Sequence, residues 1–236
     1  MLNRILRKFF CTLIFVASFY SGYSQDDSSD LNSWFVAAIE FEPAKKFKLG
    51  IETQVRLKED ISVVDQYFGE FNALYKLPYG FRIGGAFRYI RDNDTRGNIQ
   101  GYENHIRYNF DISYRHKITR LQLRYRIRYQ NRNELGISQN DGDVHREAVR
   151  FRTRFDYDFK NWKLDPIIAG ELFNRFRARD YDNGFNKYRL TLGTNYKVKK
   201  IGRFSIAYLF ENEFNIEDPR KFHIIKLGYL FEVKKK

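Results

Sequence analysis

The sequence has almost no cysteine and few long apolar runs. Its 236 residues include one cysteine, Cys11, and its mean hydropathy is −0.60. A disulfide framework needs several cysteines, so the chain is not a small disulfide-stapled domain. The low hydropathy also excludes a membrane protein built from apolar helices of about 20 residues. It does not exclude one built from strands, because a barrel strand presents an apolar side chain to lipid only at every second residue.

Aromatic and charged residues are, by contrast, abundant. Aromatic residues make up 18% of the chain, with 23 Phe and 17 Tyr, and charged residues make up 30%. Disordered chains lack the aromatics, and ordinary soluble domains rarely combine so many with so much charge. We therefore expect a folded chain, with a length that suits one or two domains.

The first 24 residues have the organisation of a secretory signal. Basic residues precede an apolar run from 9 to 20, and small residues that include Ser24 follow it. The run is short for a transmembrane helix, and its basic–apolar–small order is typical of a cleaved signal peptide. We predict a signal peptide over residues 1–24, cleavage before Gln25, and a mature chain of residues 25–236.

Residues 121–132, LQLRYRIRYQNR, show the pattern that dominates the rest of the chain. Leu, Tyr and Ile occupy odd positions up to Tyr129, and arginine or glutamine occupies the even positions. This period of two predicts a β-strand with one apolar face and one charged face. On a helix the same arginines would be spread around the whole circumference. Similar stretches occur at 34–41, 47–58, 67–77, 81–89, 106–114, 149–159, 162–172, 188–198, 204–210 and 225–233.

The connections between these stretches alternate between short turns and longer polar segments, which is the pattern of outer-membrane barrels. We therefore predict an all-β fold: a single antiparallel up-and-down transmembrane β-barrel with short periplasmic turns and longer extracellular loops. Residues 25–32 are expected to be a mobile lead-in. Bacterial single-chain barrels have an even number of strands. The stretches from 47 to 233 give ten strands, and twelve is the alternative.

Several local motifs resemble a family of uncharacterised outer-membrane β-barrels that is catalogued as a domain of unknown function. They are the secretory signal, an opening strand with Trp34, a strand end with Gln54 and Arg56, the Tyr-Lys-Leu-Pro hairpin at 75–78, and a closing Gly-Tyr strand at 228–229. The resemblance covers nearly all of the mature chain. It implies a barrel in the outer membrane of a diderm bacterium and no particular chemistry.

The predicted inward face carries the chemically active side chains. Six arginines from two consecutive strands should lie side by side, and acidic residues share their parity. These candidate residues of a lumenal charge network are Arg124, Arg126, Arg128, Arg150, Arg152, Arg154, Asp111, Asp156, Asp158 and Glu171. The network either fills a narrow lumen or forms an anion-selective constriction. Barrels of about 8 strands are filled by side chains and aqueous channels appear near 16, so we favour a largely filled lumen.

The expected function is a structural or small-solute barrel that leans towards anions. One alternative is an outer-leaflet lipid-modifying enzyme, but His105 and Ser113 are too far apart along a strand to act as base and nucleophile, at roughly 26 Å. The other is a secreted, soluble lipid-binding barrel with its apolar face inside. Aromatic residues at strand ends favour a membrane belt instead. They are Trp34, Trp162, Tyr114 and Tyr196.

The expected partners are membrane lipid, lipopolysaccharide and the barrel-assembly machinery. Nucleic acid is not expected, because the aromatic rings and the charges lie on opposite strand faces, whereas a nucleic-acid binder needs both on one face. We expect no cofactor and no metal: His105, His145 and His223 come from separated strands and lack a ligand spacing.

Overall fold

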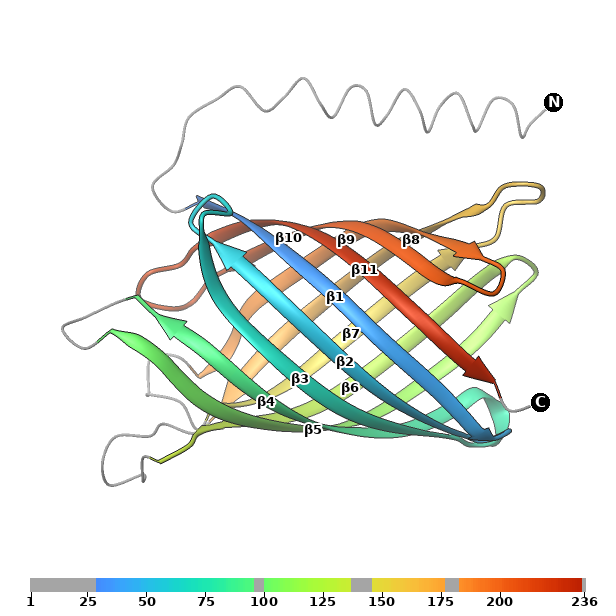
Figure 1. Cartoon of the computed structure of the whole chain (residues 1–236), viewed down its shortest axis with the longest axis horizontal. Helices are drawn as coiled ribbons and strands as arrows, with labels where there is room; N and C mark the ends of the chain where they lie inside the picture. Colours follow the sequence, from blue (N-terminus) through green and yellow to red (C-terminus); the bar gives the residue numbers. More distant parts are fainter. Residues whose placement is uncertain (1–28, 96–99, 137–145, 177–182, 235–236) are drawn as a thin grey trace, which may run out of the picture.

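The computed structural model describes residues 29–95, 100–136, 146–176 and 183–234, which form a closed β-barrel (Figure 1). The eleven strands are β1 (Ser29–Ala44), β2 (Phe47–Lys58), β3 (Val63–Lys76), β4 (Phe81–Asp94), β5 (Gly101–Ile118), β6 (Leu121–Glu134), β7 (Arg146–Tyr157), β8 (Leu164–Phe176), β9 (Gly184–Val198), β10 (Gly202–Glu213) and β11 (Lys221–Lys234). A 3-10 turn, η1 (Pro78–Gly80), joins β3 to β4. Among the described residues, no helix has the length and apolar character needed to cross a membrane.

Each strand pairs in antiparallel fashion with its neighbour in sequence, which confirms the up-and-down topology. The predicted strand number is wrong, because the described barrel has eleven strands rather than ten or twelve. The additional strand is β1, which pairs with β2 on one side and with β11 on the other. The β1–β11 pair is parallel, so the barrel can close with an odd number of strands. Its register places Trp34 beside Lys226 and Val36 beside Gly228.

The first strand begins earlier than the sequence suggested. Residues 29–32, assigned to a mobile lead-in, belong to β1, while residues 25–28 and the predicted signal peptide at 1–24 lie outside the described residues. The start of β1 holds the turn that follows β2. The Asp30 carboxylate accepts hydrogen bonds from the backbone N–H groups of Glu59 and Asp60, and the Leu31 carbonyl accepts one from Ile61 at 3.1 Å.

The two faces of the wall differ in the way that the alternation predicted. Every strand contributes large apolar side chains to the outer surface, where Phe110 is 62% and Ile127 is 53% exposed. Further examples, one from each remaining strand, are Phe35, Ile51, Phe71, Phe87, Phe151, Ile168, Leu190, Ile206 and Leu227. Buried polar residues such as Arg88, Arg150 and Glu171 come from the opposite parity. A small apolar cluster of Trp34, Leu209 and Ile224 also lies inside.

The two ends of the barrel have different connections (Figure 1). At the short-turn end, the connections are residues 45–46, 77–80, 119–120, 158–163 and 199–201. At the long-loop end they are 59–62, 95–100, 135–145, 177–183 and 214–220. The first of these loops is short because β3 begins at Val63. Pro166 fits within β8 because the β7–β8 ladder extends only to the pair Asp156–Ile167, so no β7 residue faces Pro166.

The parallel closure can be tested by a disulfide between β1 and β11. A Cβ added at Gly228 would lie 3.9 Å from the Cβ of Val36, within the range of about 3.5–4.5 Å found in disulfides. We expect Val36→Cys with Gly228→Cys, in a Cys11→Ser background, to cross-link on mild oxidation once the Ser205 hydroxyl rotates away. Mobility on a non-reducing gel reports the bond.

The control pair is Val36→Cys with Leu230→Cys, which shifts the second position by two residues, or about 6.6 Å, along β11. This pair should stay reduced under the same conditions. Equal cross-linking of both pairs, or failure of the first in a folded barrel, would contradict the parallel register.

Candidate functional site

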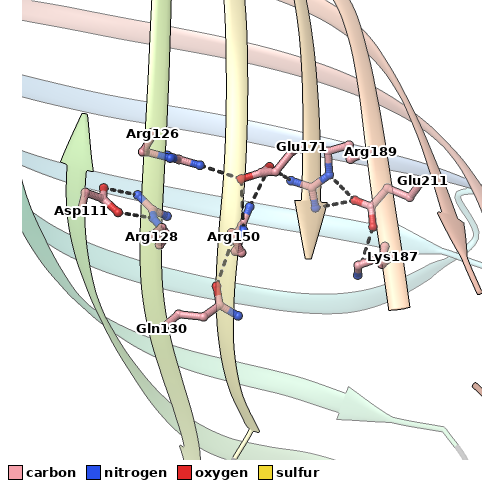
Figure 2. A network of polar contacts seen from close by, with 9 residues as sticks. All are labelled: Asp111, Arg126, Arg128, Gln130, Arg150, Glu171, Lys187, Arg189 and Glu211. Atoms are coloured by element: carbon pink, nitrogen blue, oxygen red, sulfur yellow. Dashed lines mark hydrogen bonds and ion pairs between the residues drawn. The ribbon is translucent and has the colours of Figure 1, made fainter. Parts of the chain in front are cut away.

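Glu171 on β8 is the centre of the lumenal charge network (Figure 2). Its side chain is 2% exposed, and arginines from three other strands donate hydrogen bonds to it. Arg126 donates to Oε1 at 2.7 Å. Arg150 donates to both oxygens, at 3.1 and 2.9 Å, and Arg189 donates to Oε2 at 3.4 Å. One buried carboxylate therefore offsets part of the charge of three guanidinium groups.

The network extends to both sides of Glu171 along the wall (Figure 2). On β6, Arg128 forms a two-point contact with Asp111 of β5, at 2.6 and 2.7 Å. On β10, Glu211 accepts hydrogen bonds from Arg189 at 2.6 Å and forms an ion pair with Lys187 at 3.2 Å. The interactions cross the strands from β5 to β10, so they connect more than half of the barrel wall from inside.

A second network lies on the wall of β3 to β5. Glu70 accepts a hydrogen bond from the Nε of Arg88 at 2.7 Å and another from Arg107 at 3.3 Å. The Arg88 guanidinium also lies 3.4 Å from the centre of the Phe68 ring, a cation–π contact. The same combination of a shared carboxylate and an aromatic ring occurs around Arg150, which lies 4.4 Å from the Phe173 ring.

Most of the predicted site residues do meet inside the barrel, but not all of them are paired. Three predicted carboxylates accept hydrogen bonds from predicted arginines. Asp111 accepts from Arg128, Glu171 accepts from Arg126 and Arg150, and Asp156 also accepts from an arginine. Arg154 pairs with Asp156 on its own strand. Asp158 is not part of the network: β7 ends at Tyr157, so the alternation no longer applies, and Asp158 is exposed in the following turn.

Arg124 and Arg152 face the lumen without an ion pair to a described carboxylate. Arg152 stands beside Glu171 in the β7–β8 register, but Glu171 is already occupied by three other arginines. Arg124 lies between Arg115 and Arg154 in register, and its Nε is buried without a partner. The six arginines are thus only partly neutralised.

Four residues of the network were not among the predicted site residues, namely Gln130, Lys187, Arg189 and Glu211. The alternation of apolar and polar residues in the sequence could have identified them. Tyr188, Leu190 and Leu192 define the apolar face of β9, so Lys187 and Arg189 fall on the inward parity. The predicted site was restricted to the densest arginine run, and these two cations lie outside it.

Trp34 does not belong to a membrane belt. It has the inward parity of β1 and is 7% exposed. The Arg56 guanidinium lies 3.9 Å from its ring centre, and that of Arg189 lies 5.2 Å away. The strand-end interpretation was wrong because β1 begins at Ser29, which places Trp34 well inside the strand.

A cavity of about 940 Å³ occupies the long-loop half of the lumen, and we call it the vestibule. Its deepest lining includes Trp34, Arg56, Arg189 and Glu211, and acidic residues are frequent towards the loops. Among these, Asp65 forms an ion pair with Lys58 at 3.8 Å, and Asp92 pairs with Arg132. The vestibule is therefore of mixed charge at the rim and basic at its floor.

One group on the vestibule wall has side chains of the metal-binding types. Ligand atoms of Asp92, Glu103 and His105 lie within 4.8 Å of one another. These atoms already have partners, since His105 contacts Glu103 at 3.0 Å and Asp92 pairs with Arg132. His223 is separate, on the outer face beside Tyr208, and His145 lies outside the described residues.

The sequence matches a known family over most of its length. Residues 31–222 match the family described as Protein of unknown function (DUF2490). The chain belongs to this family. No curated protein matches the chain. Among solved structures, the crystal structure of the β domain of the Bordetella autotransporter BrkA is similar, with 10% sequence identity, a TM-score of 0.46, and coverage of 75% of this chain and 81% of that one.

Membership of this family confirms the resemblance drawn from the sequence motifs, and it assigns no reaction or ligand. The matched residues 31–222 include all of the network residues named above.

The network makes a specific prediction about stability. We expect Glu171→Gln to lower the free energy of unfolding by about 3–5 kcal/mol, because it leaves Arg126, Arg150 and Arg189 buried with less compensation. Urea titration of the refolded barrel in detergent micelles, followed by tryptophan fluorescence, measures the change.

The matched control is Glu40→Gln. Glu40 also forms an ion pair, with Lys48 at 2.9 Å, but the two side chains are 37% and 30% exposed. Removing a solvent-exposed pair should cost about 1 kcal/mol or less. Similar losses in both variants would show that Glu171 has no central role.

Proposed function

We propose that the protein is an integral outer-membrane β-barrel of a diderm bacterium, made with a signal peptide that is removed before Gln25. The observation that supports this most is the exposed apolar surface contributed by every strand. In water such a surface would promote aggregation. In a bilayer it is the surface that a barrel wall presents to lipid.

Aromatic contacts near both ends of the barrel support the same proposal. Near the short-turn end, Phe81 packs against Tyr114 and Phe204 packs against Tyr229. Near the long-loop end, Tyr188 contacts Phe210. Membrane barrels have aromatic girdles at both interfaces, where an amphipathic ring is most stable. In this arrangement the short turns are periplasmic and the long loops extracellular.

The lumenal network supports a structural or small-solute role rather than that of an open pore. Paired arginines and carboxylates of β5 to β10 extend into the lumen around Glu171 (Figure 2). Small barrels leave little room beyond their own side chains. We infer a largely filled lumen that favours anions where water enters, with lipid, lipopolysaccharide and the barrel-assembly machinery as partners.

The two alternative functions have less support. A soluble lipid-binding barrel would carry its apolar side chains inside, whereas here Phe110 and Ile127 are on the outside. For an outer-leaflet enzyme, His105 and Ser113 lie on the same strand, eight positions apart, with His105 engaged by Glu103. We propose no hydrolytic site from these residues.

The proposed location predicts how the protein fractionates. The mature chain should begin at Gln25, sediment with the outer membrane, and remain there after carbonate or high-salt washing, because the barrel is held by lipid rather than by charge. N-terminal sequencing and membrane fractionation measure both properties. Recovery as a soluble protein, or a retained Met1, would contradict the proposal.

The filled lumen predicts little ion conduction. We expect purified protein in planar bilayers to show no steady openings in a potassium chloride gradient, because the side chains of the Glu171 network extend from the wall into the lumen. Steady anion-selective openings that shift towards cations in the double variant Arg126→Glu, Arg152→Glu would instead support an open pore.

A further inference from the structure

Several cations inside the barrel have no carboxylate partner among the described residues. Arg56, Arg152 and Lys226 form no ion pair there, and the Nε of Arg56 is buried without a hydrogen-bond partner. The Trp34 ring compensates the Arg56 charge only in part, through a cation–π contact. Buried charges are normally paired, so a group of unpaired cations indicates that counter-charge comes from elsewhere.

Two of these cations, Arg56 and Lys226, lie at the seam where β1 meets β11. In register, Trp34 of β1 has Lys226 of β11 on one side and Arg56 of β2 on the other. Arg189 of β9 reaches the same ring. Glu52 shares the inward face of β2 with Arg56. The Glu52 carboxylate also lies 3.9 Å from Arg88.

This part of the seam is accessible from the long-loop end. Trp34, Arg56 and Arg189 line the vestibule, whose volume of about 940 Å³ admits a small solute. The acidic groups nearest to the floor already have partners, since Glu211 is held by Arg189 and Lys187. An incoming anion would therefore meet an excess of positive charge at the floor.

We propose that the vestibule floor is a binding site for a small oxyanion, a phosphate or carboxylate group of a soluble solute, held by Arg56 and Arg189 of the lining and by Lys226, which lies next to Trp34 in register. Guanidinium and ammonium groups are the usual partners of such oxygens, and their hydrogen bonds are stronger than those between neutral groups. The inference rests on the proposed outer-membrane barrel only for the side from which the solute enters. Binding itself is a property of the folded barrel.

Trp34 provides a reporter within the site. The chain has two tryptophans, and the second, Trp162, packs on Phe159 in the β7–β8 connection. In the Trp162→Phe variant, folded in detergent, we expect inorganic phosphate to change the Trp34 fluorescence saturably. Iodide should quench that fluorescence more strongly than caesium, because the floor attracts anions.

Substitutions at the site should weaken binding without altering charge elsewhere. In the Trp162→Phe background, Lys226→Gln is expected to raise the apparent dissociation constant for phosphate about tenfold, the loss of one charge-assisted hydrogen bond. Arg82→Gln is the matched control: it also removes an inward-facing arginine, but from the second residue of β4 at the short-turn end. It should leave the constant unchanged.

Each outcome is decisive once heat-dependent migration on a gel shows a folded barrel. A saturable response lost in Lys226→Gln and kept in Arg82→Gln supports the site. No saturable response, an equal loss in both variants, or equal quenching by iodide and caesium overturns it. If Lys226→Gln does not fold, the iodide and caesium comparison on Trp162→Phe still decides.

One further titration identifies the source of the ligand. Response to short-chain phosphatidylglycerol without response to phosphate would assign the site to a lipid headgroup and overturn the proposal of a soluble solute. The titrations are done in detergent, so their outcome does not depend on membrane fractionation, which tests the location.

Discussion

The hydrogen bonds between β1 and β11 are the constraint on which the rest of the barrel depends. They leave neither strand with an unpaired edge, and so every strand of the described barrel has two neighbours. Closure also determines the width of the lumen. An interior enclosed by eleven strands is too wide for small side chains alone to fill, and long side chains such as arginine can reach towards its centre. The arginine-rich inward face therefore suits the width of the lumen that the closed sheet creates.

Arginines on adjacent strands repel one another, so the interior needs carboxylates at particular places. Arg126 lies opposite Arg152 in register, and Arg128 lies opposite Arg150. Glu171 and Asp111 stand on the strands that flank this double row, where they accept hydrogen bonds from it. The compensation is local and incomplete. It is strongest along β5 to β10 and weakest at the β1–β11 seam.

The alternation of residues was sufficient to predict the strands and their faces, because in a strand the face depends only on parity. Residues 47–58 were predicted with the bounds that the structure shows. The strand number was not predictable in this way. It depends on a pairing between the two ends of the chain, and periodicity within β1 or β11 contains no information about that partner. A parallel closing pair removes the need for an even count.

The candidate site was predictable as a face but not as a set of contacts. Parity placed Arg152 and Arg154 inside correctly. Which carboxylate each meets depends on register and on reach across strands, as when Glu171 binds Arg189 and leaves Arg152 without an ion pair to a described carboxylate. Asp158 shows the limit of parity, which has no meaning beyond the last residue of a strand. Trp34 shows a second limit. It was predicted to lie at the membrane interface, but it lies inside the barrel next to Arg56.

The network and the proposed anion site share Arg189 but differ in the source of their counter-charge. Around Glu171 the counter-charge is built into the chain, and the guanidinium groups are held in fixed positions. At the vestibule floor the chain supplies cations and an aromatic ring but too few carboxylates. An anion bound there would provide counter-charge for Arg56 and Lys226, which form no ion pair with a described carboxylate. Since it would bind the folded barrel and not the unfolded chain, its binding and the stability of the barrel are linked.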